Sequence, residues 1–76
     1  MIVDYSFNAS KADKTITFDE ESKTVGKKTT WYTAQGKAQG MDGEFVLTIS
    51  NDGEFEPILE FHHGNKTISV MNVSIH

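Results

Sequence analysis

Hydrophobic and polar residues alternate most regularly in the second half of the chain, over residues 44–75. Apolar side chains recur there at every second position, as in Phe45, Leu47 and Ile49. A period of two is typical of a β-strand that buries one of its two faces. Two glycine-containing turn signals divide the stretch, so we predict a three-stranded antiparallel meander. Its strands are expected over residues 44–50, 54–62 and 66–75.

The two turns set the expected register. Gly64 precedes Asn65 in a two-residue loop, the arrangement of a type II′ turn, because glycine adopts the required positive φ without strain. The segment 51–53 fits a three-residue loop that ends in a left-handed glycine. These turns pair Phe61 with Ile68, Leu59 with Val70, Ile49 with Phe55, and Phe45 with Leu59. One face of the predicted sheet then carries Phe45, Leu47, Ile49, Phe55, Leu59, Phe61, Ile68 and Val70.

The pattern changes phase near the end of the last predicted strand. Met71, Val73 and Ile75 fall on the parity opposite to that of Ile68 and Val70. A bulge near Met71 would return Val73 and Ile75 to the core face. Without a bulge, an apolar row crosses the outer face and needs a cover from the first half of the chain or from a partner. That row consists of Val46, Ile58 and Met71.

The first half of the chain is less apolar but still alternates. We predict strands over residues 2–7, 15–19 and 24–34, with a turn at 20–22. Gly26 indicates a bulge or a close backbone approach within the third of these strands. Residues 35–43 contain three glycines and are expected to form a loop, either a plain connector or a mobile binding loop.

These patterns predict an all-β fold with six antiparallel strands, mainly in a meander. The sheet is expected to coil strongly or to close into a small, partly open barrel. An α+β alternative extends Ser10–Lys14 into a short helix over the sheet. Seventy-six residues without cysteine allow one small domain, residues 1–76, whose stability cannot rest on disulfides.

Composition excludes several classes of function. The net charge of −4 disfavours a nucleic-acid binder, which needs a basic face. No apolar run is long enough to cross a membrane, and we expect a soluble, cytoplasmic protein. The chain has no Gly-x-Ser-x-Gly elbow, no phosphate-binding loop and no cysteine nucleophile. A core this small leaves little room for a deep pocket, so we expect neither an enzyme nor a bound cofactor.

One polar group could carry chemistry. The predicted register places Glu44 directly across from Glu60 on the outer face, with His62 next along the same strand. Two carboxylates and one imidazole can bind a divalent metal or act as an acid–base pair. The alternative is an ordinary solvated acidic face of the sheet.

The leading functional expectation is a small protein-interaction module, such as an inhibitor or accessory factor. Trp31 and Tyr32 are adjacent and point to opposite faces of a regular strand. An exposed strand edge, or a surface formed by these aromatics with Val46, Ile58 and Met71, would contact a protein partner. Self-association is a special case, because a second copy would enlarge the core. The alternative function is a ligand- or metal-binding domain.

Overall fold

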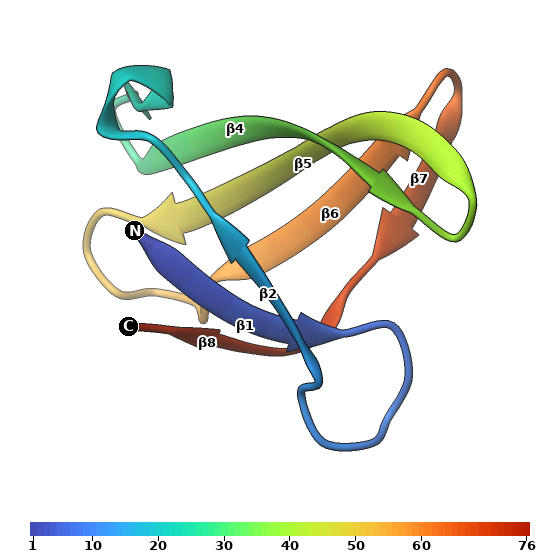
Figure 1. Ribbon diagram of the computed structural model, residues 1–76. Helices are drawn as coiled ribbons and strands as arrows, with labels where there is room; N and C mark the ends of the chain where they lie inside the picture. Colours follow the sequence, from blue (N-terminus) through green and yellow to red (C-terminus); the bar gives the residue numbers. More distant parts are fainter.

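The computed structural model describes residues 1–76 and has an all-β architecture, as predicted, with two antiparallel sheets that are not closed into a barrel (Figure 1). Its only helical segment is a three-residue 3-10 turn, η1, at Glu20–Ser22, where the sequence predicts a turn. The strands are β1 (Ile2–Ser6), β2 (Lys14–Thr17), β3 (Thr24–Val25), β4 (Thr29–Ala38), β5 (Met41–Ser50), β6 (Ile58–His63), β7 (Lys66–Ser69) and β8 (Met71–Ile75).

The larger sheet has five strands in the order β3-β4-β5-β6-β7, which is an up-and-down meander. The smaller sheet has the order β2-β1-β8 and lies across one face of the larger one (Figure 1). The chain therefore leaves the small sheet after β2, builds the whole meander, and returns with β8 beside β1. The two ends of the chain lie close together, and the backbone amide of His76 donates to the carbonyl oxygen of Ile2 at 2.9 Å.

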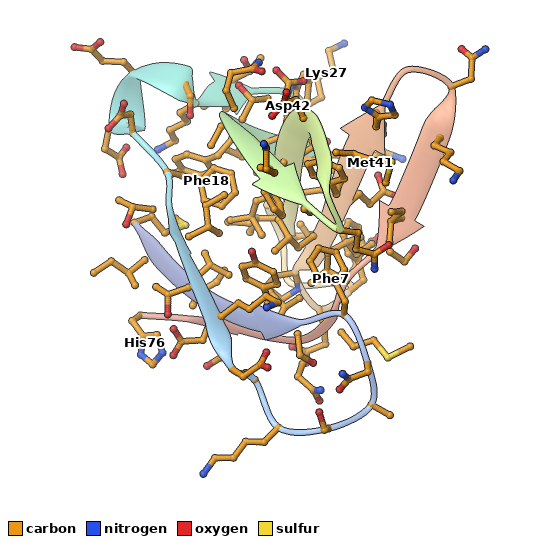
Figure 2. All side chains as sticks on the ribbon, turned by 45° about the vertical axis from the view of Figure 1, so that its right-hand side comes forward. Phe7, Phe18, Lys27, Met41, Asp42 and His76 are labelled. Carbon is orange, nitrogen blue, oxygen red and sulfur yellow. The ribbon has the colours of Figure 1, made fainter.

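The core lies between the two sheets and is rich in aromatic side chains. The rings of Phe45 and Phe61 pack with centroids 4.9 Å apart, and Tyr5 contacts Phe45 at 5.6 Å. Phe18, in the connection after β2, points into the interior and is 1% exposed (Figure 2). The buried apolar side chains are Val3, Tyr5, Phe18, Tyr32, Ala38, Phe45, Leu47, Leu59 and Phe61.

The predicted type II′ turn and its register are confirmed between β6 and β7. Gly64 has φ +57°, Asn65 does not have positive φ, and Phe61 lies opposite Ile68. The amide of Val70 donates to the carbonyl oxygen of Leu59, as the predicted pairing of these two residues requires.

The register between β5 and β6 differs from the prediction by two residues. Phe45 lies opposite Phe61 instead of Leu59, and Leu59 lies opposite Leu47. The loop runs on past Gly53 to Pro57, because the ladder excludes a residue that has no amide hydrogen to donate. Phe55 therefore lies in this loop, 40% exposed, and its predicted place on the core face opposite Ile49 is wrong.

Residues 35–43 form a hairpin, so the predicted loop is wrong. β4 and β5 continue to a two-residue turn at Gln39 and Gly40, both with positive φ. Gly36 lies directly opposite Gly43. A side chain on Gly43 would come within 2.6 Å of the ring of Phe61 and 2.3 Å of the His62 carbonyl oxygen. The glycines therefore make room for the core aromatic rings and are not signs of a mobile loop.

The predicted strand 66–75 is two strands in different sheets. The chain crosses from one sheet to the other at Val70, and Asn72 then adopts φ +55°. β8 carries one extra residue relative to β1 between the pairs Ser6–Met71 and Asp4–Ser74. This irregularity is the predicted bulge, and it brings Val73 and Ile75 against the core.

Two further predictions are corrected by the structure. The predicted strand 24–34 breaks into β3 and β4 around a turn in which the Gly26 amide donates to the Thr29 carbonyl oxygen. The chain therefore has eight strands instead of six. Residues 10–14 form no helix, so the α+β alternative is wrong.

Candidate functional site

The outer face of the five-stranded sheet points away from the small sheet, and no other element lies over it (Figure 1). Cross-strand pairing arranges most of its side chains in three rows that each span four strands, and the pair Lys37–Asp42 lies beyond the third row on β4 and β5. The first row runs Thr24, Trp31, Thr48, Ile58; the second runs Thr33, Val46, Glu60, Ser69; the third runs Gln35, Glu44, His62, Thr67.

Three apolar side chains lie at neighbouring positions on this face. Trp31 and Ile58 flank Thr48 in one row, and Val46 is the next residue of its face along β5. Ile58 is 46% exposed, whereas Trp31 and Val46 are half-buried. An added Cβ on Gly26 would come within 2.9 Å of the Thr29 carbonyl oxygen, so the predicted close backbone approach is confirmed, and within 3.1 Å of the Trp31 indole ring. We call Trp31, Val46 and Ile58 the apolar patch.

Two of the residues predicted to bind a partner lie elsewhere. Tyr32 points to the core face and is 4% exposed, with its ring 6.3 Å from that of Phe18. Met71 is exposed but belongs to β8 in the small sheet. The row of Val46, Ile58 and Met71 that an unbulged strand would form is therefore absent, and Val46 lies opposite Glu60, one row away from Ile58. The expectation that Trp31 and Tyr32 face opposite sides of one strand is confirmed.

The predicted polar group lies next to the apolar patch, with a changed register. Glu44 lies opposite His62, whereas Glu60 lies opposite Val46. His62 Nε2 is 3.3 Å from Glu60 Oε1. Gln35 Nε2 donates to Glu44 Oε2 at 3.2 Å, and Thr67 Oγ1 lies 3.3 Å from His62 Nδ1. The direct carboxylate–carboxylate opposition predicted from the sequence is wrong, because the two-residue register shift places His62 instead of Glu60 opposite Glu44.

No group of three or more His, Asp or Glu side chains in the structure is arranged to hold a metal ion. Glu44, Glu60 and His62 share a face, but each is tied to a neighbour by the contacts above. The metal and ligand hypothesis for these three residues stays a prediction.

The open edge of β4 is the second feature that the sequence predicts as a contact surface. Thr33 directs its amide away from β5, to Ser22 Oγ of η1 at 3.2 Å. Because backbone groups alternate sides along an antiparallel strand, Gln35 and Lys37 direct theirs to the same side. No backbone group pairs with them there. Lys37 at this position is typical of an edge that avoids further strand pairing.

A third polar group lies on the outer face of the small sheet and has no counterpart in the sequence predictions. Asp4 accepts a hydrogen bond from Thr15 Oγ1 at 2.8 Å and lies 2.7 Å from His76 Nε2. Figure 2 shows His76 on the side of β1 and β8 that faces away from the core. The hydrogen bonds from Thr15 and then from His76 hold the pKa of Asp4 below its usual value. The pairing of β1 with β2 places Thr15 beside Asp4, and the pairing of β1 with β8 brings in His76.

The structure contains no pocket. It also contains no helix with the length and hydropathy needed to span a bilayer. Comparisons with family models, curated proteins and solved structures gave no match to this chain.

Proposed function

We propose that this chain is a small protein-binding module that contacts its partner through the outer face of the five-stranded sheet. The observation that carries the proposal is the apolar patch of Trp31, Val46 and Ile58, gathered from three adjacent strands on a face that no element covers. Tryptophan and aliphatic side chains surrounded by polar residues are typical of the centre of protein interfaces.

The shape of the molecule supports binding by a surface. An open, long-stranded sheet without a pocket can offer a large contact area to another protein but cannot enclose a small molecule. The face is preferred to the open edge of β4, because Lys37 and the cover provided by η1 at Thr33 discourage strand addition there.

The test is capture of partners from the cells that make the protein, with two matched variants. Ile58→Lys places a charge in the apolar patch, whereas Ile2→Lys makes the same change on the outer face of the small sheet. Ile2 is 48% exposed and Ile58 is 46% exposed, so both variants should fold with similar stability. Thermal melting checks this before the comparison.

The proposal predicts a protein that the parent and Ile2→Lys both capture and that Ile58→Lys loses. It is overturned if Ile58→Lys captures every protein that the parent captures, or if Ile2→Lys loses the same protein.

A further inference from the structure

The charges beside the apolar patch have one sign. Glu60 lies directly across from Val46 and is two residues from Ile58 on the same strand. Glu44 is two residues from Val46 on β5. Both carboxylates therefore border the patch, Glu60 across from Val46 on β6 and Glu44 beside it along β5, within the area that any cover of the patch would contact.

Neither carboxylate has a lysine partner within the chain. Glu60 contacts the imidazole of His62, and Glu44 accepts from the amide of Gln35. The only lysine in an ion pair is Lys37, whose Nζ lies 3.8 Å from Asp42 at the far end of the hairpin. A protein that covered the patch would remove water from Glu44 and Glu60, which costs free energy unless it supplies compensating cations.

A second copy of the chain is poorly suited to supply them. In a symmetric dimer the same face is buried on both copies, so the only cations available to Glu44 and Glu60 are those of this same outer face. The outer face carries one lysine against three acids, Asp42, Glu44 and Glu60, and the chain as a whole has a net charge of −4. Like charges placed together across an interface are unfavourable, so the charge of this face disfavours a symmetric dimer through it.

We infer that the outer face of the five-stranded sheet binds a protein segment in which apolar side chains are flanked by arginine or lysine. The apolar side chains pack on Trp31, Val46 and Ile58, and the cationic groups pair with Glu44 and Glu60. Arginine fits best, because its planar guanidinium makes two parallel hydrogen bonds to a carboxylate. This inference rests on the proposed function and adds the chemistry of the partner.

The test uses two synthetic probes and nuclear magnetic resonance of the isotope-labelled protein. One probe is a short peptide in which leucine alternates with arginine, and the other replaces each arginine by glutamate. We expect the leucine–arginine peptide to shift the backbone amide signals of residues 31, 46, 58 and 60, and the leucine–glutamate peptide to leave them unchanged. Binding should weaken between about 0.1 M and about 1 M salt, over which the Debye length falls from about 10 Å to about 3 Å.

Two double variants separate local from overall charge. Glu44→Gln with Glu60→Gln should weaken binding of the leucine–arginine peptide about tenfold. Glu54→Gln with Glu56→Gln changes the net charge equally, but both residues lie exposed in the loop after β5. This control should leave the affinity unchanged.

Different failures have different meanings. If the leucine–glutamate peptide binds the same face as tightly, or if the Glu44/Glu60 double variant binds like the parent, the charge inference is wrong and the face remains a protein-binding surface. If the leucine–arginine peptide shifts no signals on this face, the inference is also wrong. The function is then decided by the capture experiment with Ile58→Lys and Ile2→Lys.

Discussion

At the scale of single residues, the fold depends on two kinds of position: glycines that leave no room for a side chain, and a carboxylate held by two side-chain hydrogen bonds. Gly43 is the tightest of these, since an added Cβ would lie 2.3 Å from the backbone oxygen of His62. Backbone atoms inside a sheet cannot move aside without breaking the ladder. Gly43 does not have positive φ, so its backbone conformation does not require glycine. Close packing requires it instead.

Gly43→Ala should lower the free energy of unfolding by about 3 kcal/mol, because overpacking forces the backbone and the Phe61 ring to shift. The control is Gly40→Asn at the hairpin turn. Gly40 has φ +77° with no atom within 4 Å of an added Cβ, and asparagine tolerates this conformation, so the loss should be below about 1 kcal/mol. Urea denaturation measures both. Equal losses would contradict the packing of Phe61 over Gly43.

Asp4 is the residue whose ionisation should make stability depend on pH. Hydrogen bonds from Thr15 and His76 lower its pKa in the folded state below the ordinary 3.8. The stabilisation is therefore complete above the unfolded-state pKa and is lost as the pH falls through the lower folded-state value.

Asp4→Asn should consequently be less stable than the parent at neutral pH, and the difference should shrink in strong acid. Urea midpoints at pH 7 and at about pH 2 test this. Glu21→Gln is the control, because Glu21 lies exposed in η1. An Asp4→Asn deficit that is the same at both pH values would show that the carboxylate does not stabilise the fold through its charge.

At the scale of strands, the faces of the β5 and β6 residues could be predicted from the sequence, whereas the register between these two strands could not. A period of two assigns Phe45, Leu47, Leu59 and Phe61 to one face, and all four are buried. A shift of two residues preserves every one of these faces, so the alternation cannot detect it. The register between β5 and β6 is set by the length of the loop that joins them. Gly53 supplies the left-handed residue of this loop, but the loop continues to Pro57.

The same reasoning explains the other differences at this scale. Gly36 and Gly43 interrupt the alternation where aromatic rings fill the space of missing side chains, so a long hairpin resembles a loop. The sheet change at Val70 has one local sign, Asn72, whose amide group donates to Ser6 Oγ at 2.9 Å and to the carbonyl oxygen of Asn8 at 3.2 Å. Those partners are more than sixty residues away along the chain, which local patterns do not reveal.

The register makes a direct prediction for two phenylalanines ten residues apart. Phe45→Ala should lower the free energy of unfolding by about 3 to 5 kcal/mol, because the side chain is 2% exposed in the centre of the core. Phe55→Ala should cost about 1 kcal/mol or less, since the side chain is 40% exposed in a loop. Denaturation of both variants checks the difference. If both variants lose a similar free energy of unfolding, the side chain of Phe55 is buried and its predicted pairing with Ile49 is favoured over the observed register.

At the scale of the whole molecule, two sheets share one aromatic core and leave one broad face uncovered. The apolar patch on that face favours contact with another protein, and the bordering acids disfavour contact with a second copy. The site could be predicted from the sequence only in part. Trp31, Val46 and Ile58 share the expected surface, whereas Tyr32 belongs to the core and Met71 to the other sheet.

The charge argument predicts the mass of the protein in solution. Light scattering on a sizing column should give the monomer mass of 8.5 kDa over a wide range of concentration at low salt. This outcome is expected because the acids bordering the patch would repel acids of a second copy, and low salt screens that repulsion least. A dimer that Ile58→Lys dissociates and Ile2→Lys leaves intact would show that the face binds its own copy.

Site-specific photo-crosslinking tests most directly whether the outer face of the five-stranded sheet binds another protein. A photoreactive phenylalanine derivative replaces Thr48, between Trp31 and Ile58, or Thr17, opposite Ile2 on the outer face of the small sheet. Irradiation of cells that make the protein should link position 48 to a different protein and leave position 17 unlinked. Equal adducts at both positions, or adducts at position 17 alone, would contradict this account.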